Sequence, residues 1–200
     1  MKQKPGWVLP DLKEAQKRTT NTIDRIDTFT IPEAARMMGR GKTYFISTYG
    51  CQANERDSET LAGILDELGF TPNETAEGSD VIIINTCAIR QNAEEKVLGE
   101  IGNFKRLYRE NKDLIIGVCG CMAQEEGLVE TLLTKYPQVR LLFGTHNIQE
   151  LPSMLYSCMF EGKKVVKIYS KEGEVYENLP VHRFGTFKAW VNIMYGCDKF

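Results

Sequence analysis

The fold is determined by the stretch Val81-Ile82-Ile83-Ile84-Asn85-Thr86-Cys87. Four consecutive branched apolar residues predict a strand that is buried on both faces, as in the centre of a parallel sheet. The polar residues Asn85 and Thr86 end this run, and Cys87 follows them directly. Cys87 is therefore expected at the carboxyl edge of a parallel sheet, where open α/β folds bind their ligands.

Apolar runs alternate with helical patterns along the rest of the chain. Strands are expected near 42–48, 114–116 and 141–143, with a short edge strand near 70–71. Helices are expected from 54 to 68, from 91 to 111, through 130–135 and from 148 to 160. Asn54 is the expected N-cap of the first of these helices, and Gly69 ends it. This order predicts the α/β class, with a parallel sheet covered by helices on both faces.

Composition and charge narrow the possible classes of protein. The 200 residues are 42% hydrophobic, which is enough to bury a core. Lys and Arg total 25 against 27 for Asp and Glu, so the overall charge does not indicate a nucleic-acid surface. No apolar run approaches the roughly 18 residues of a membrane helix, and residues 1–10 lack the apolar region of a signal peptide. These features predict a cytoplasmic protein with no membrane partner.

Four segments are expected. Residues 1–41 read as a polar, partly helical extension, with short helices near 11–18 and after Ile31-Pro32-Glu33. Residues 42–162 form the α/β domain, and 163–187 read as a linker with an extra strand near 165–169. Residues 188–200 contain a fresh apolar strand. Because the sequence stops directly after that strand, we expect it to be a truncated chain.

The cysteines suggest a metal site. Six are present, at positions 51, 87, 119, 121, 158 and 197, in a chain without a secretory signal, so metal binding or redox chemistry is favoured over disulfides. Cys51, Cys87 and Cys121 each follow a predicted strand and are expected to converge at one edge of the sheet. Three thiolates leave one metal position open, which favours an iron-sulfur site over a closed zinc site with four ligands.

Other assignments of the same residues remain open. Cys119 lies two residues before Cys121, on the same side of a strand, so periodicity does not choose between them. A zinc-stabilised interaction module would use Cys51, Cys87 and Cys121 with either Cys119 or His146 as the fourth ligand.

A flavodoxin-like binding module would need a glycine-rich phosphate loop, and the spacing of the glycines does not provide one. Among the remaining candidates, Cys158 is expected to pack in the core and His182 to be solvated in the linker. Arg90 is expected to be a surface residue.

Several strings carry a family resemblance. They are Thr48-Tyr49-Gly50-Cys51-Gln52-Ala53-Asn54, Asp57-Ser58-Glu59, Ile84-Asn85-Thr86-Cys87-Ala88-Ile89-Arg90 and Gly120-Cys121-Met122-Ala123-Gln124. In this order they resemble the amino-terminal domain of the radical S-adenosylmethionine methylthiotransferases. Tyr195-Gly196-Cys197-Asp198-Lys199-Phe200 resembles the beginning of that family's CxxxCxxC motif. The resemblance covers residues 42–200.

The resemblance implies a Rossmann or flavodoxin-like domain, followed by the first strand of a radical S-adenosylmethionine barrel. It implies that Cys51, Cys87 and Cys121 hold an auxiliary [4Fe-4S] cluster. The choice of Cys121 over Cys119 rests on the Gly-Cys-Met-Ala-Gln string. Cys197 would belong to a second, radical-generating [4Fe-4S] cluster whose other cysteines are absent. No catalytic residue beyond these ligands is assigned.

The resemblance also implies a substrate. Gln52 and Phe143-Gly144-Thr145-His146-Asn147 resemble the branch that acts on tRNA, adding a methylthio group to carbon 2 of dimethylallyl-modified adenosine beside the anticodon. Branches that act on threonylcarbamoyladenosine or on a ribosomal protein are the alternatives. The implied co-substrate is S-adenosylmethionine, and a monomer is expected. The 200 residues alone are expected to be inactive.

Overall fold

The computed structural model describes residues 7–8, 24–26, 28–87, 91–168 and 174–191. The helix expected near 11–18, Arg90 and Cys197 lie outside these ranges. The main sheet has seven parallel strands in the order β1-β8-β7-β6-β5-β3-β4. Its strands are β1 Trp7–Val8, β3 Thr43–Tyr49, β4 Thr71–Pro72, β5 Val81–Thr86, β6 Ile115–Gly120, β7 Val139–Phe143 and β8 Lys164–Lys167.

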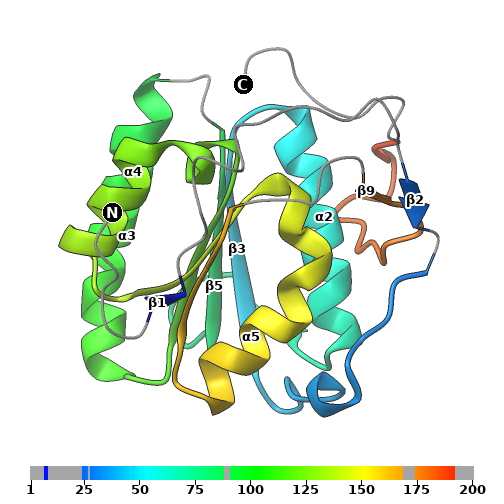
Figure 1. Cartoon of the computed structure of the whole chain (residues 1–200), viewed down its shortest axis with the longest axis horizontal. Coiled ribbons are helices and arrows are strands. Elements are labelled where there is room, and N and C mark those ends of the chain that lie inside the picture. The colour runs from blue at the N-terminus through cyan, green and yellow to red at the C-terminus, as the bar shows by residue number, and fades with distance from the viewer. Residues whose placement is uncertain (1–6, 9–23, 27, 88–90, 169–173, 192–200) are drawn as a thin grey trace.

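Helices cover both faces of this sheet (Figure 1). They are α2 Gln52–Glu67, α3 Gln91–Glu110, α4 Glu126–Lys135 and α5 Leu151–Phe160. Along β5, Ile82 and Ile84 are buried with α3 and α4, whereas Val81 and Ile83 are buried with α2 and α5. This alternation follows from the twofold period of a strand. It confirms the predicted α/β class with helices on both faces.

Helix α2 begins at the carboxyl edge of the sheet, directly after Cys51. The predicted buried face of the helix is present, and Leu61, Ile64 and Leu65 are fully buried. The predicted N-cap is wrong: Cys51 is the cap, and Asn54 is the third residue of the helix. The Asn54 side chain accepts the backbone N–H of Cys51 at 3.1 Å, so it still serves the helix start from inside the first turn.

Two other boundaries differ from expectation. The helix predicted from residue 148 begins as a 3₁₀ helix, η3 Thr145–Glu150, and α5 starts only at Leu151. Pro152 in the first turn of α5 fits this start, because proline lacks the N–H that a later position would need. Strand β6 continues to Gly120, where η2 Cys121–Gln124 begins. The turn after Pro32 is a short 3₁₀ helix, η1 Glu33–Ala35.

Strand β8 lies inside the main sheet, between β7 and β1. The sheet therefore continues past residue 162, where the prediction placed the end of the domain. The expected helical extension also contributes strands. In addition to β1, β2 Asp24–Ile26 pairs in parallel with β9 Glu174–Tyr176 in a small second sheet. Runs of two or three residues carry no periodicity from which these pairings could be predicted.

Residues 177–191 form a C-terminal strap that crosses the outer face of α2. The strap backbone packs against Gly63, where an added Cβ atom would lie 2.5 Å from the carbonyl carbon of Pro180. The prediction that His182 is merely solvated is wrong. Its side chain is 34% exposed and its Nδ1 lies 2.5 Å from Oδ2 of Asp66. Residues 189–191, from the predicted last strand, are described and are not in a strand.

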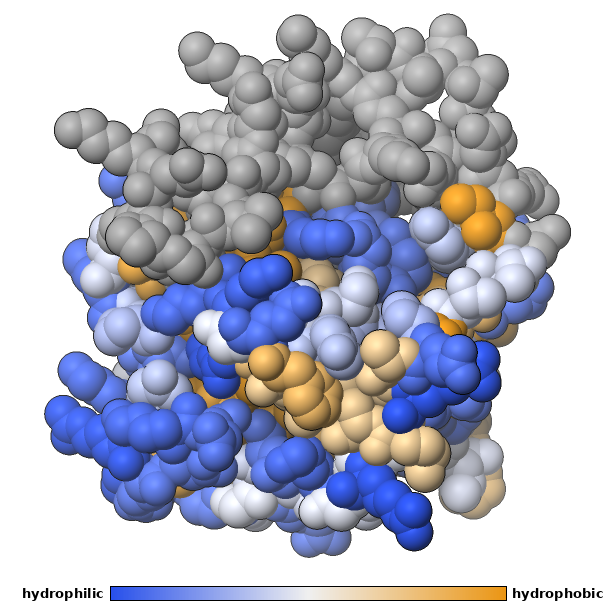
Figure 2. Space-filling view, turned by 60° about the horizontal axis from the view of Figure 1, so that its bottom comes forward, coloured by the Kyte–Doolittle hydropathy of each residue, from blue (hydrophilic) through white to orange (hydrophobic). Residues whose placement is uncertain are grey.

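Within the described ranges, no helix is long and apolar enough to cross a membrane. On the face drawn in Figure 2, the described surface is largely hydrophilic, with a few separate apolar areas.

Candidate metal centre

Strand register brings the three cysteine positions to one edge of the sheet. Strands β3, β5 and β6 are adjacent. Thr86 at the end of β5 pairs with Gly120 at the end of β6. Cys87 directly follows Thr86, and Cys121 directly follows Gly120. Thr86 also pairs with Tyr49 of β3, two residues before Cys51. Because neighbouring strands lie about 4.8 Å apart, all three cysteines come within two residues of a narrow stretch of this edge.

The three thiols differ in exposure. Cys51 is exposed, Cys121 is partly exposed and Cys87 is buried. In the described part of the chain, no group of three or more His, Cys, Asp or Glu side chains is arranged to hold a metal ion. The fold thus gathers the three cysteine positions without bringing their sulfur atoms into a closed set of ligands.

Glycines allow the cysteine loops to approach one another. Gly120 has a φ of +98°, and a Cβ atom there would lie 2.1 Å from the carbonyl oxygen of Thr86. A Cβ atom at Gly50 would lie 2.8 Å from the Cβ of Cys87. The loops that carry all three cysteines are therefore in close contact. Soft thiolate donors on three such loops fit an iron-sulfur cluster better than a hard cation.

Cys119 and Cys121 differ in burial. Cys119 is 1% exposed and packs in the core between the sheet and helices α2 and α5. Burial raises the pKa of the Cys119 thiol well above its usual range, and the nearby charges of Asp57 and Cys121 raise it further. A thiol that stays protonated is a poor metal ligand. These observations favour Cys121, which follows the strand and is partly exposed.

Of the other candidates, Cys158 packs in the core, and His146 lies in η3, which follows β7 at the same edge of the sheet. Cys158 is fully buried in α5, as predicted, and burial raises its pKa to about 11. His146 is exposed in η3, where its backbone carbonyl accepts the side chain of Gln149 at 2.8 Å.

A buried network of uncharged polar groups lies beneath the cysteine edge. Asn54 and Asn85 are each 1% exposed, and Ser58 is fully buried. Asn85 Nδ2 donates to the carbonyl of Asn54 at 2.8 Å and to Ser58 Oγ at 2.9 Å. Ser58 Oγ lies 2.7 Å from Thr48 Oγ1. Sequence reasoning missed this network, although its members sit within the strings that carry the family resemblance.

Two of those strings also meet in space. A Cβ atom at Gly144 would lie 2.8 Å from Nε2 of Gln124. The hydroxyl of Thr86 donates to Sδ of Met122 at 3.6 Å. The segments after β5, β6 and β7 are therefore packed together at this edge.

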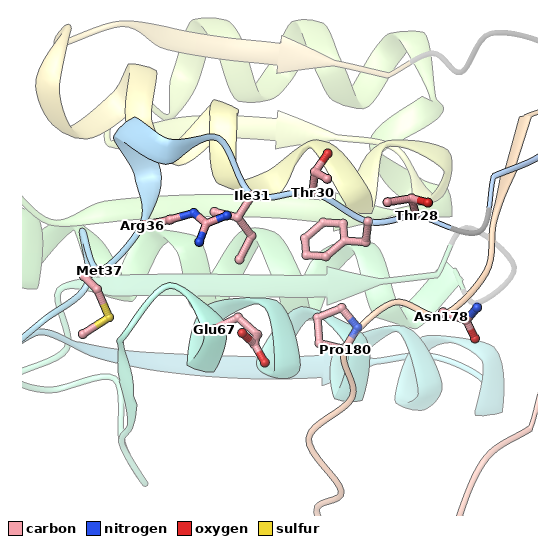
Figure 3. A pocket seen from close by; sticks show the side chains of 9 residues that line it. Thr28, Thr30, Ile31, Arg36, Met37, Glu67, Asn178 and Pro180 are labelled. Carbon is pink, nitrogen blue, oxygen red and sulfur yellow. The ribbon is translucent and has the colours of Figure 1, made fainter.

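Two cavities lie along α2. One of about 300 Å³ opens beside the cysteine edge and is bounded by Thr48, Glu55, Lys188 and Trp190. A larger cavity, of about 610 Å³, lies at the other end of the helix, with Arg36 and Glu67 on opposite sides (Figure 3). Because α2 has 16 residues, its two ends are roughly 24 Å apart. The larger cavity is therefore remote from the cysteines.

Comparison with known proteins gives one family and many relatives. The family model described as "Uncharacterized protein family UPF0004" matches residues 43–144. A tRNA-2-methylthio-N(6)-dimethylallyladenosine synthase of Staphylococcus saprophyticus is 56% identical over 191 residues, which are 96% of this chain and 37% of the relative. The synthase of the same name from Geobacillus thermodenitrificans is 54% identical, over 96% of this chain and 36% of the relative.

A third synthase of this name, from Bacillus licheniformis, is 53% identical over 194 residues, covering 97% of this chain and 38% of the relative. The chain thus spans little more than a third of the length of these curated relatives. Their names agree with the methylthiotransferase resemblance of the sequence strings.

Proposed function

The chain belongs to the UPF0004 family, and on that premise we propose that it is the part of a tRNA methylthiotransferase that binds an auxiliary [4Fe-4S] cluster. Cys51, Cys87 and Cys121 would hold the cluster. The observation that carries this proposal is the register of three adjacent strands, each of which is followed within two residues by one of these cysteines. The names of the relatives support the same reading.

The three ligands have different tasks. Cys87 is buried against the end of β5 and anchors the site to the centre of the sheet. Cys51 and Cys121 are more exposed and lie on loops that follow the neighbouring strands. When bound, the cluster would have one iron without a protein ligand, which would leave a position open for the sulfur that is transferred.

The substrate and cofactors of the longer protein follow from the same proposal. It transfers a methylthio group to carbon 2 of dimethylallyl-modified adenosine in tRNA, beside the anticodon, and consumes S-adenosylmethionine. Cys197 would bind the second, radical-generating [4Fe-4S] cluster together with cysteines outside this chain. We further propose that the protein acts in the cytoplasm as a monomer.

Anaerobic reconstitution tests the auxiliary site in this chain. The protein is incubated with iron and sulfide and then desalted, and bound iron, acid-labile sulfide and visible absorption are measured. We expect about four irons and four sulfides per chain and a brown protein. A variant with Cys51→Ala, Cys87→Ala and Cys121→Ala should lose all three signals.

Cys158→Ala is the matched control, because it removes a buried thiol that packs in α5 away from the edge. This variant should retain the cluster. Colourless zinc bound in place of iron would contradict the proposal and favour a zinc-stabilised interaction module. Equal iron in the triple variant would also contradict it, since the three cysteines would then not be the ligands.

A further inference from the structure

We infer that Asn54 and Asn85 form a positioning pair that fixes the three cysteine loops relative to one another. This inference rests on the proposed cluster site. Neither residue is a ligand. Their two amide groups bond to the loop of Cys51 and to the end of the strand before Cys87, and they fill the space beside the glycine before Cys121 where a side chain would lie.

The contact with the first loop is made by one oxygen atom. Asn54 Oδ1 accepts the backbone N–H of Cys51 at 3.1 Å and its Sγ–H at 3.4 Å. The same oxygen would lie 2.2 Å from a Cβ atom at Gly50, so the loop backbone is packed directly onto the amide. A longer or bulkier side chain at position 54 would push this loop away from the sheet.

The other half of the Asn54 amide reaches the next strand. Its Nδ2 donates to Asn85 Oδ1 at 3.1 Å and to the carbonyl of Thr86 at 3.2 Å. Thr86 is the residue before Cys87. One amide thus connects the Cys51 loop to the backbone that carries Cys87.

Asn85 extends the connection to the third loop. Its Oδ1 would lie 2.7 Å from a Cβ atom at Gly120, the residue before Cys121. Its Nδ2 donates back to the carbonyl of Asn54 at 2.8 Å. Two hydrogen bonds therefore connect the residues, one between their side chains and one from the Asn85 side chain to the Asn54 backbone, and Asn85 also packs beside the loop of Cys121.

Burial makes this arrangement rigid. Both residues are 1% exposed, so water does not replace a lost partner, and an unpaired buried amide is costly. Both side chains are also uncharged, so they add no charge beneath three thiolates. Groups that orient metal ligands in this way typically change metal affinity by about 10-fold to 100-fold when removed.

The test compares cluster retention in three variants of the whole chain. Asn54→Ala removes both halves of the amide. Asn54→Asp keeps the size and the acceptor for Cys51 but replaces the donor that faces Asn85 and Thr86. Gln138→Ala is the matched control, because Gln138 is also 1% exposed and its amide makes a hydrogen bond, to Ile101 at 3.0 Å, away from the cysteine edge.

After reconstitution, each protein is titrated with an iron chelator, and thermal unfolding of each apoprotein is recorded. Asn54→Ala and Asn54→Asp should release iron at about 10-fold lower chelator concentration than the unmodified chain. Gln138→Ala should release iron as the unmodified chain does, even if its melting temperature falls. Equal retention in Asn54→Ala and Gln138→Ala would overturn the inference.

A second probe separates this inference from the proposed function. Cd²⁺ binds soft thiolates without sulfide, and its ultraviolet thiolate absorption reports the convergence of Cys51, Cys87 and Cys121 in the apoprotein. The triple alanine variant gives the background from other thiols. Asn54→Ala should weaken Cd²⁺ binding about 10-fold.

If the unmodified chain assembles no iron-sulfur cluster but Asn54→Ala still weakens Cd²⁺ binding, the proposed function fails and the positioning role stands. If the cluster forms but Asn54→Ala leaves Cd²⁺ binding unchanged, the proposed function stands and the positioning role is refuted.

Discussion

Helix α2 joins two regions that are held by opposite means. At its amino end, under the cysteine edge, buried uncharged amides and hydroxyls connect the helix to β5. Along its outer face, charged side chains connect the helix to the C-terminal strap. Glu59 Oε2 lies 2.6 Å from Arg183 Nη1, and Glu55 Oε2 lies 2.9 Å from Lys188 Nζ.

Buried neutral contacts and charged contacts near the surface respond differently to mutation and to solvent. Buried neutral hydrogen bonds have few alternative partners and fix a geometry, which the proposed cluster site would need. An exposed ion pair such as Glu55–Lys188 competes with water and salt, so it contributes little energy and tolerates rearrangement, whereas Glu59 of the other pair is largely shielded. The cysteine edge is therefore expected to be sensitive to single atoms, and the strap to solution conditions.

The most damaging change should be Gly120→Ala, which breaks the first region. Alanine must adopt the φ of +98° with its Cβ atom 2.1 Å from the carbonyl oxygen of Thr86. We expect a loss of about 3 kcal/mol or more in the free energy of unfolding, measured with urea. Gly162→Ala is the control, since it shares a positive φ of +63° but has nothing within 4 Å. It should cost only about 1 kcal/mol, and equal losses would mean that the contact with Thr86 is unimportant.

The next largest effect should come from Gly63→Ala, which breaks the second region without changing a charge. The new Cβ atom would lie 2.5 Å from the backbone of Pro180, so the strap must shift away from α2. We expect the free energy of unfolding to fall by about 1 to 3 kcal/mol, and we expect faster tryptic cleavage after Arg183 and Lys188.

Gly99→Ala provides a control for the helical substitution itself. Gly99 lies within α3 and has nothing within 4 Å of an added Cβ atom. The free energy of unfolding of this variant should rise by about 0.5 to 1 kcal/mol. Unchanged cleavage of the strap in Gly63→Ala would contradict the close packing.

Glu100 of α3 is a partly buried carboxyl group, so it tests how burial affects a group that can carry a charge. Ser47 Oγ donates to Glu100 at 3.1 Å and Tyr49 donates as well, but burial outweighs both and raises the pKa of the Glu100 carboxyl. The folded state therefore binds this proton more tightly than the unfolded state does. Its contribution to stability is complete below the ordinary carboxyl pKa and is lost as pH rises to the raised value.

Glu100→Gln stays uncharged, so it should unfold like the unmodified chain at about pH 4 and be more stable at about pH 7. Urea unfolding at both values measures the difference. A variant that is less stable at neutral pH would show that the hydrogen bonds outweigh burial.

Local patterns in the sequence predicted much of this fold, for physical reasons that particular elements illustrate. Strand β5 is a run of four apolar residues buried on both faces, and α2 has apolar residues at helical spacing, so each reveals its environment within a few residues. The order of strands and helices then placed Cys51, Cys87 and Cys121 at one edge. No local pattern could choose between Cys119 and Cys121, because that choice depends on where β6 ends.

Features that depend on distant pairing were not predictable in this way. The Asn54 and Asn85 amides are 31 residues apart in sequence, and Asn54 alone resembles an ordinary helix cap. His182 and Asp66 are 116 residues apart, so the strap read as a solvated linker. Such contacts form only after the sheet has brought the segments together.

The smallest effects on the free energy of unfolding should distinguish the two ion pairs between α2 and the strap. Glu59 is 6% exposed and its partner Arg183 is 41% exposed, whereas Glu55 and Lys188 are 49% and 60% exposed. Glu59→Gln should cost about 1 kcal/mol, because it weakens a hydrogen bond to a charged group that water reaches poorly. Glu55→Gln should cost about 0.3 kcal/mol at low salt and nothing measurable at about 1 M NaCl, where the Debye length is about 3 Å. Urea unfolding of both variants at both salt concentrations makes the comparison. The Nζ atom of Lys188 lies 4.0 Å from the ring centroid of Trp190. If the loss of stability in Glu55→Gln persisted at high salt, the Lys188 contact would depend on packing over this ring. The ion pairs between α2 and the strap would then respond less to salt than their exposure implies.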